Sequence, residues 1–158
     1  MIQVIDNFIN EEEIKYILSN WDEDSKKYCN GAIRFYFIDF LENQIDLSYI
    51  NQGSFSAVKF SKVWLQRYDE EIEPITDFHG HKNIYNYILY LNDGYSGGKI
   101  EFENGLTLKP KKGMLVYFNN NELHRVEKCV GTRFTLSLWG DDEVHLNYKK
   151  HESYKSII

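Results

Sequence analysis

A histidine and an arginine nine positions apart, His124 and Arg133, are the residues of this chain best suited to chemistry. An imidazole nitrogen is a common metal ligand, and a guanidinium pairs with a carboxylate through two parallel hydrogen bonds. Side chains alternate with the period of a β-strand over residues 132–139, which places Arg133 on one face and Phe134 on the other. We expect Arg133 to point into the fold, where an unpaired guanidinium is costly unless it meets an anion. His124 is therefore a candidate metal ligand, and Arg133 is a candidate site for a ligand carboxylate.

Short motifs between Trp64 and Trp139, about half of the chain, stand in the order and spacing of one enzyme family. They are Arg67-Tyr68, Leu89-Tyr90-Leu91-Asn92, Gly97-Gly98-Lys99-Ile100-Glu101-Phe102, Lys109-Pro110-Lys111-Lys112-Gly113, Phe118, His124-Arg125-Val126, Gly131-Thr132-Arg133 and Trp139. This segment resembles the 2-oxoglutarate- and Fe(II)-dependent dioxygenases, specifically their prolyl-4-hydroxylase-like branch.

The resemblance implies a mainly β fold, the double-stranded β-helix or cupin-like jelly roll. It also implies an enzyme that uses Fe(II), 2-oxoglutarate and O2, with ascorbate as an accessory reductant. The expected reaction is hydroxylation of an unactivated C–H bond with release of succinate and CO2. A peptidyl proline is the substrate that the branch implies, and other peptide, protein or small-molecule substrates stay open because fold does not fix function.

The metal ligands are the point at which the chain departs from the family pattern. The family supplies a His-x-Asp pair and a distal histidine, and His124 resembles the distal one. The segment that should hold the pair, residues 73–81, reads Glu-Pro-Ile-Thr-Asp-Phe-His-Gly-His. Counting back from Tyr90 places Ile75 at the histidine position and Asp77 at the aspartate position. This first alignment lacks one ligand, because isoleucine has no donor atom.

A second alignment counts forward from Tyr68 and places Asp77 at the histidine position and His79 at the aspartate position. It keeps two nitrogens and one carboxylate, the set that non-haem Fe(II) oxygenases use, and residues two apart face the same side of a strand. We therefore predict Asp77, His79 and His124 as the metal ligands. Entry of His81 into the coordination shell and a degenerate site are the two alternatives.

The resemblance also implies a pocket for 2-oxoglutarate. Arg133 resembles the cation that binds the 5-carboxylate, and Tyr90 resembles its hydroxyl partner. Tyr68 is expected to offer a second hydroxyl near the metal. Ser137 and Thr135 share the strand face of Arg133, so we predict that they line the same cavity.

The elements that must position these side chains follow from caps, turns and periodicity. Asn10 and Glu13 form a capping-box pair, which predicts a helix within an N-terminal support that spans residues 1–57. Short strands separated by turns, without helical spacers, predict an antiparallel jelly-roll core over residues 58–139. The predicted strands span residues 58–68, 84–91, 99–103, 106–108, 114–118, 124–128 and 132–139.

Other segments have weaker signals. The aromatic run at residues 33–41 does not distinguish helix from strand, and residues 140–158 are predicted to form a solvated tail. Gly97-Gly98 predicts a tight backbone turn beside the site. Trp64 and Trp139 are predicted to be core residues.

Length and composition agree with a single domain over residues 1–158. Aromatic residues make up 16% of the chain against only two prolines, which favours strands over disorder. A net charge of −6 does not suit a phosphate-binding surface, so we expect no nucleic-acid partner. No cationic, apolar leader and no apolar run of about 18 residues is present, which predicts a cytoplasmic protein without a membrane partner. The two cysteines lack metal-type spacing and are expected to be free thiols.

Three functional classes follow from these residues, and the active hydroxylase is our prediction. A catalytically silent β-helix module that binds a ligand or protein is the alternative, because Ile75 stands where a ligand is expected. A dioxygenase that uses three histidines without 2-oxoglutarate comes third. It would need His79, His81 and His124 together, and it would leave Arg133 without a role.

Overall fold

The computed structural model describes residues 1–30, 34–40, 45–56, 58–74, 76–144 and 154–157. Ile75 therefore lies outside the described residues, and so do residues 31–33, 41–44 and most of the C-terminal segment. The helical elements are α1 (Glu11–Leu18) and the short 3₁₀ turns η1 (Leu47–Tyr49) and η2 (Asn51–Gly53). No helix within these ranges is long and apolar enough to cross a membrane.

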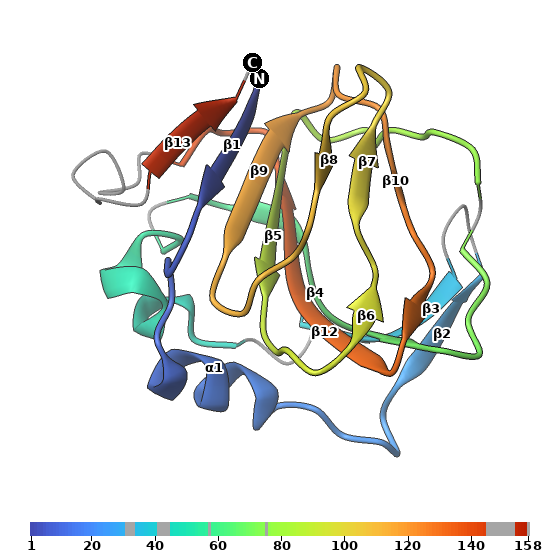
Figure 1. Cartoon of the computed structure of the whole chain (residues 1–158). Helices are drawn as coiled ribbons and strands as arrows, with labels where there is room; N and C mark the ends of the chain where they lie inside the picture. Colours follow the sequence, from blue (N-terminus) through green and yellow to red (C-terminus); the bar gives the residue numbers. More distant parts are fainter. Residues whose placement is uncertain (31–33, 41–44, 57, 75, 145–153, 158) are drawn as a thin grey trace.

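The fold is a double-stranded β-helix, as predicted (Figure 1). The strands of its large sheet are β1 (Ile2–Ile5), β2 (Lys27–Asn30), β3 (Arg34–Asp39), β4 (Phe60–Asp69), β5 (Tyr85–Tyr90), β9 (Leu115–Asn119), β12 (Thr132–Gly140) and β13 (Tyr154–Ile157). They run antiparallel in the order β13-β1-β9-β5-β12-β4-β3-β2. The shorter strands are β6 (Ser96–Gly97), β7 (Ile100–Phe102), β8 (Thr107–Leu108), β10 (His124–Val126) and β11 (Cys129–Val130). They form a three-stranded sheet, β10-β7-β8, and a two-stranded ribbon, β11-β6.

The two faces of β12 serve different purposes, because its side chains alternate across the sheet. Leu136 and Leu138 are fully buried in the larger hydrophobic core, where Ile14 and Ile17 of α1 pack against the sheet. The helix begins as predicted: Asn10 Oδ1 accepts from the backbone N–H of Glu13, and Glu13 Oε1 accepts from that of Asn10. The opposite face of the large sheet is turned toward the small sheet.

The small sheet covers the other face of the large one. Ile100 and Phe102 of β7 pack against Val116 and Phe118 of β9 in a second apolar cluster. The strip of the large sheet that carries Arg133 lies beyond this cluster. The two sheets are therefore packed at one side and leave room for a polar cavity at the other.

All seven predicted strands are present, with bounds that differ by a few residues. Residues 34–39 of the undecided run form strand β3, which pairs with β4. The N-terminal support also contains β1, which the sequence analysis missed. The predicted solvated tail is corrected in part, since Tyr154–Ile157 pairs with β1 along its whole length. This pairing satisfies backbone groups that β1 would otherwise expose at a sheet edge.

The Gly97-Gly98 pair lies beside the site, but the predicted tight turn is corrected: Gly97 ends strand β6, and the N–H of Gly98 donates to the carbonyl oxygen of Lys128 at 3.2 Å as the chain continues toward β7. Both residues have positive φ, +71° and +70°, a region that side chains disfavour. A Cβ atom at Gly97 would lie 2.3 Å from the carbonyl oxygen of Lys128, and one at Gly98 would lie 3.3 Å from Nη1 of Arg133. The glycines thus let the backbone pass directly over the arginine. Both cysteines are free, as expected.

Candidate active site

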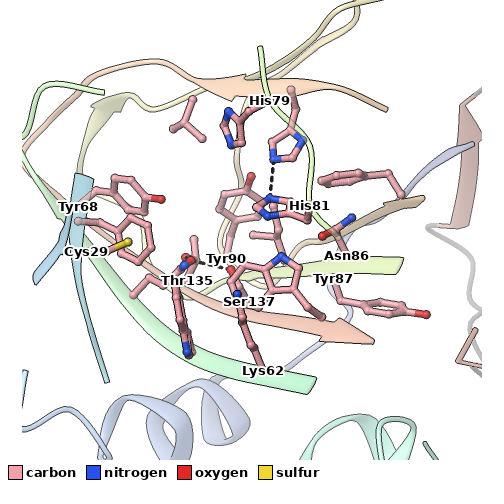
Figure 2. Close-up of a pocket in the computed structure, with 18 of the residues that line it drawn as sticks. Cys29, Lys62, Tyr68, His79, His81, Asn86, Tyr87, Tyr90, Thr135 and Ser137 are labelled. Atoms are coloured by element: carbon pink, nitrogen blue, oxygen red, sulfur yellow. Dashed lines mark hydrogen bonds between the residues drawn. The ribbon is translucent and has the colours of Figure 1, made fainter. Parts of the chain in front are cut away.

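A cavity of about 230 Å³ opens between the large sheet and the segment that carries His79 and His81. Figure 2 shows these two histidines above the sheet, with Tyr68 and Tyr90 to one side. Strand β12 contributes four alternate residues to its lining, as the period-two pattern predicted: Arg133, Thr135, Ser137 and Trp139. Its neighbours β4 and β5 contribute residues in register with these.

Three histidines meet at one end of the cavity. Single ligand nitrogens of His79, His81 and His124 all lie within 4.8 Å of one another. Nε2 of His81 is 3.2 Å from Nε2 of His124. Two nitrogens that bind one ion at about 2.0–2.1 Å and at right angles are about 3 Å apart, so this spacing fits a shared metal ion. Among the described residues the three form a candidate metal site.

Backbone contacts orient two of the three rings. His79 and His124 form an isolated antiparallel bridge in which each N–H donates to the other's carbonyl oxygen at 3.0 Å. Nδ1 of His124 is 3.3 Å from the carbonyl oxygen of Glu122, and Nδ1 of His79 is 3.4 Å from that of Asp77. A carbonyl beside Nδ1 selects the tautomer with the lone pair on Nε2. These contacts therefore prepare both rings for binding a metal through Nε2.

Asp77 is not where the predicted ligand set requires it. Its side chain is exposed, its carboxylate is outside the histidine group, and it approaches the site only through its backbone carbonyl. The chain bends at Asp77, so Asp77 and His79 do not share a strand face. The i, i+2 relation instead joins His79 and His81. Of the predicted ligands, the structure brings together His79 and His124, and it adds His81.

Burial keeps these histidines neutral. Together with the neighbouring imidazoles, it lowers the pKa of His124 to about 3 and that of His81 to about 4. The pKa of His79 is also lowered, mainly by burial. A neutral imidazole has the free lone pair that a metal ligand needs.

We expect the metal-free protein to lose stability as the pH falls from about 6.5. Unfolded histidines take up a proton near pH 6.5, whereas folded His81 and His124 stay neutral down to about pH 4 and 3. The unfolded chain then binds more protons than the folded one, so acid favours unfolding. The free energy of unfolding should fall by up to about 1.4 kcal/mol per pH unit for each such histidine. Above pH 7 this contribution is absent.

Urea unfolding of the metal-free protein between pH 7.5 and 4.5 measures the slope. His124→Phe should flatten it, and an unchanged slope in that variant would contradict the assignment.

Arg133 lies at the other end of the cavity and is 3% exposed. Its Nη1 donates to the carbonyl oxygen of Gly98 at 2.6 Å, and its guanidinium carbon is 4.4 Å from the ring centroid of Tyr68 and 5.7 Å from that of Tyr90. Its Nε is buried without a hydrogen-bond partner. Among the residues that the structure describes, no carboxylate forms an ion pair with it. A buried cation with an unused donor is suited to a ligand carboxylate.

The predicted tyrosines flank this arginine. Burial raises the pKa of both Tyr68 and Tyr90, although the charge of Arg133 opposes the rise. Their hydroxyls therefore stay protonated and able to donate to an anion. Ser137 also lines the cavity, but its hydroxyl donates to Gln66 Oε1 at 2.6 Å. The hydroxyl of Thr135 donates to the same oxygen at 3.0 Å.

Sequence reasoning missed several residues of this cavity. Trp64 and Trp139 were expected to be core residues; Trp139 is buried and Trp64 is half-buried against an apolar cluster, and both also line the cavity, where their rings meet edge to face at 5.3 Å. The period-two pattern of β12 already placed Trp139 on the face of Arg133. No comparable signal identified Gln66 or Asn86, because their positions depend on how β4 and β5 align with β12.

Comparisons with known proteins agree with this geometry. Residues 63–140 match the family model of the 2OG-Fe(II) oxygenase superfamily. A comparison with curated proteins gives no match.

Three similar solved structures are prolyl hydroxylases. A viral collagen prolyl hydroxylase from Paramecium Bursaria Chlorella virus-1, in a 2OG complex, is 14% identical, with a TM-score of 0.70 over 87% of this chain and 94% of that one. A prolyl-4-hydroxylase from Pseudomonas putida is 17% identical, with a TM-score of 0.69 over 90% and 92%. A prolyl hydroxylase from Trichoplax adhaerens, in complex with a hypoxia inducible factor oxygen degradation domain peptide fragment, is 15% identical, with a TM-score of 0.72 over 89% and 83%.

At these identities the structures show a shared fold, while the matched segment contains β12 and most of the cavity residues. The chain belongs to the 2OG-Fe(II) oxygenase superfamily and has the fold of its prolyl-4-hydroxylase-like branch.

Proposed function

We propose that the protein is an Fe(II)- and 2-oxoglutarate-dependent dioxygenase that hydroxylates an unactivated C–H bond of a peptide, with a peptidyl proline as the first candidate. The observation that carries the proposal is the shared cavity, which has three neutral histidines at one end and a buried arginine without a carboxylate partner at the other. The bound iron and cosubstrate would supply the oxidising chemistry: O2 gives one oxygen atom to succinate and one to the product, and CO2 leaves.

The donor set fits ferrous iron, because imidazole is a suitable ligand for iron. His79, His81 and His124 would hold the ion. The set differs from the usual two histidines and one carboxylate in carrying no negative charge. The dianionic cosubstrate would supply the compensating charge.

The rest of the cavity binds and orients the cosubstrate. Arg133 would pair with its 5-carboxylate through Nε and the guanidinium edge, and Tyr68 and Tyr90 are positioned to donate hydroxyl protons to the same group. Preorganised donors of this kind fix the ligand without reorganisation. Trp139 and Phe118 line the cavity beside the histidines and exclude water from that end.

The similarity in fold to known prolyl hydroxylases supports the proposal of a peptide substrate. The similar structures named above are prolyl hydroxylases, and the one from Trichoplax adhaerens contains a peptide fragment. We further propose that ascorbate is an accessory reductant and not a required cosubstrate.

One second candidate has its own observation. A three-histidine dioxygenase that does not use 2-oxoglutarate would need the histidine group that the structure brings together. Such an enzyme would leave the Nε of Arg133 buried without a hydrogen-bond partner, so we rank this candidate below the proposal.

Anaerobic addition of Fe(II) and 2-oxoglutarate to the metal-free protein tests the proposal. We expect a visible metal-to-ligand charge-transfer band that requires both components, and formation of succinate once O2 is admitted. Iron binding without the band would favour the three-histidine dioxygenase, and no iron binding would favour a silent ligand-binding module. Either of the last two results would overturn the proposal.

A further inference from the structure

Buried polar atoms without partners gather in the cavity. Among the described residues five side-chain atoms are buried and lack a hydrogen bond, and four of them belong to residues that line it. They are Nε of Arg133, Nε1 of Trp64, and both Nδ2 and Oδ1 of Asn86. Buried polar groups are nearly always paired in native proteins, because an unpaired one loses its hydrogen bonds to water without replacement. The cosubstrate accounts for Arg133, but it leaves the indole and the amide unexplained.

Asn86 lies at the far end of the cavity from Arg133. On β5 it is in register with Trp139 of β12 on one side and Phe118 of β9 on the other. Trp139 is six residues from Arg133 along its strand, a separation of about 20 Å. The histidines are nearer to Asn86: the ring of His81 is 5.6 Å from that of Trp139, and the ring of His124 is 4.7 Å from that of Phe118. Figure 2 shows Asn86 on the histidine side of the cavity.

The chemistry of a carboxamide defines what can pair with it. Asn86 is 2% exposed, and it presents a donor and an acceptor together on a strand flanked by Trp139 and Phe118. A carboxylate ligand accepts hydrogen bonds but cannot donate to Oδ1, and an ammonium ligand donates but cannot accept from Nδ2. A neutral amide offers both an N–H and a C=O.

We propose that Asn86 is a substrate-binding residue that pairs with an amide group, either of a peptide backbone or of a carboxamide, next to the histidine site. The inference rests on the proposed function only in naming this ligand as the substrate. Binding of the amide itself needs neither iron nor cosubstrate. Asn86 would determine specificity by leaving its own donor or acceptor unpaired when the ligand lacks the matching group.

Probe titrations of the metal-free protein test the pairing. The side-chain amide signal of Asn86, assigned by its loss in Asn86→Leu, is followed by nitrogen-15 NMR. N-acetylalanine N-methylamide represents a peptide and acetamide a carboxamide, while acetone has the carbonyl but no N–H. We expect at least one amide probe to shift the signal and to bind about tenfold more tightly than acetone, as expected for one additional buried hydrogen bond. The amide probe that binds more tightly shows whether the ligand amide belongs to a peptide backbone or to a carboxamide. Equal binding of all three probes, or no shift with any, would overturn the inference.

Variants separate a binding role from a structural one. Asn86→Leu has similar volume and removes both unpaired atoms, so we expect it to raise the melting temperature of the ligand-free protein and to weaken the amide probe about tenfold. Asn86→Val is the second variant if leucine does not fit. Asn119→Leu is the matched control, because Asn119 also has an unpaired oxygen but does not line the cavity, and it should leave probe binding unchanged. A lower melting temperature in both Asn86 variants with unchanged probe affinity would show a structural role and overturn the inference.

Discussion

His81→Ala is expected to weaken Fe(II) binding by more than about 100-fold, whereas Asp77→Asn is expected to change it by less than about threefold. Removal of an outer-shell partner typically costs a metal site about 10–100-fold, so removal of a ligand should cost more. His81 contributes one of the three nitrogens that converge, while the carboxylate of Asp77 points to solvent. Isothermal titration calorimetry with Fe(II) under anaerobic conditions measures the affinity of each variant. Titration with Co(II), followed by visible absorption, is an alternative.

The same pair of variants also tests the predicted ligand set directly. If Asp77→Asn lost the metal and His81→Ala kept it, the result would support Asp77, His79 and His124 as the ligands and exclude His81. His81→Asp adds a further control, because it introduces the carboxylate that the family normally has. It should retain metal and reduce the affinity for an anionic probe such as azide, since the centre loses one unit of positive charge.

Arg133→Met is expected to weaken 2-oxoglutarate binding by about 150–5000-fold and to leave Fe(II) affinity unchanged. Removing one partner of a buried, hydrogen-bonded charge pair costs about 3–5 kcal/mol, which corresponds to this range. Methionine keeps much of the packing between the two tyrosine rings without the charge. Titration of 2-oxoglutarate into the iron-loaded protein under anaerobic conditions measures the effect through the charge-transfer band.

Lys62→Met is the matched control for charge, because Lys62 is a second cation among the described residues that line the cavity. It is exposed and lies over the rings of Trp64 and Trp139, away from Tyr68. Its loss should change cosubstrate affinity by less than about threefold, since exposed charges are screened. Equal effects of the two substitutions would mean that general positive charge, and not the Arg133 pocket, attracts the cosubstrate.

Local patterns predicted the strands and the helix well. The alternation at residues 132–139 separated Arg133 from Leu136 and Leu138, and the structure divides them in the same way between the cavity and the core. The capping box at Asn10 and Glu13 was also sufficient to locate α1. Such signals succeed because they depend on neighbours a few residues away in the chain.

Contacts between distant segments were harder to predict. The choice between Asp77 and His81 depended on where the backbone bends before it pairs with His124, a bridge between residues that are 45 positions apart. The strand at Tyr154–Ile157 exists by pairing with β1, at the opposite end of the sequence. The amide of Asn86 became a candidate only when the structure showed that neither of its polar atoms has a partner. A single sequence contains no local signal for these relations.

The position of β12 has a consequence for the order in which the site can be made. This strand lies between β4 and β5, both of which precede it in the sequence, so the two cannot reach their final arrangement in the sheet until residues 132–140 are available. Arg133 and three other cavity residues arrive with that strand. Pairings this distant in sequence form slowly. The nascent chain would therefore have no complete pocket to offer iron or 2-oxoglutarate before β12 is in place, and loading would follow that step.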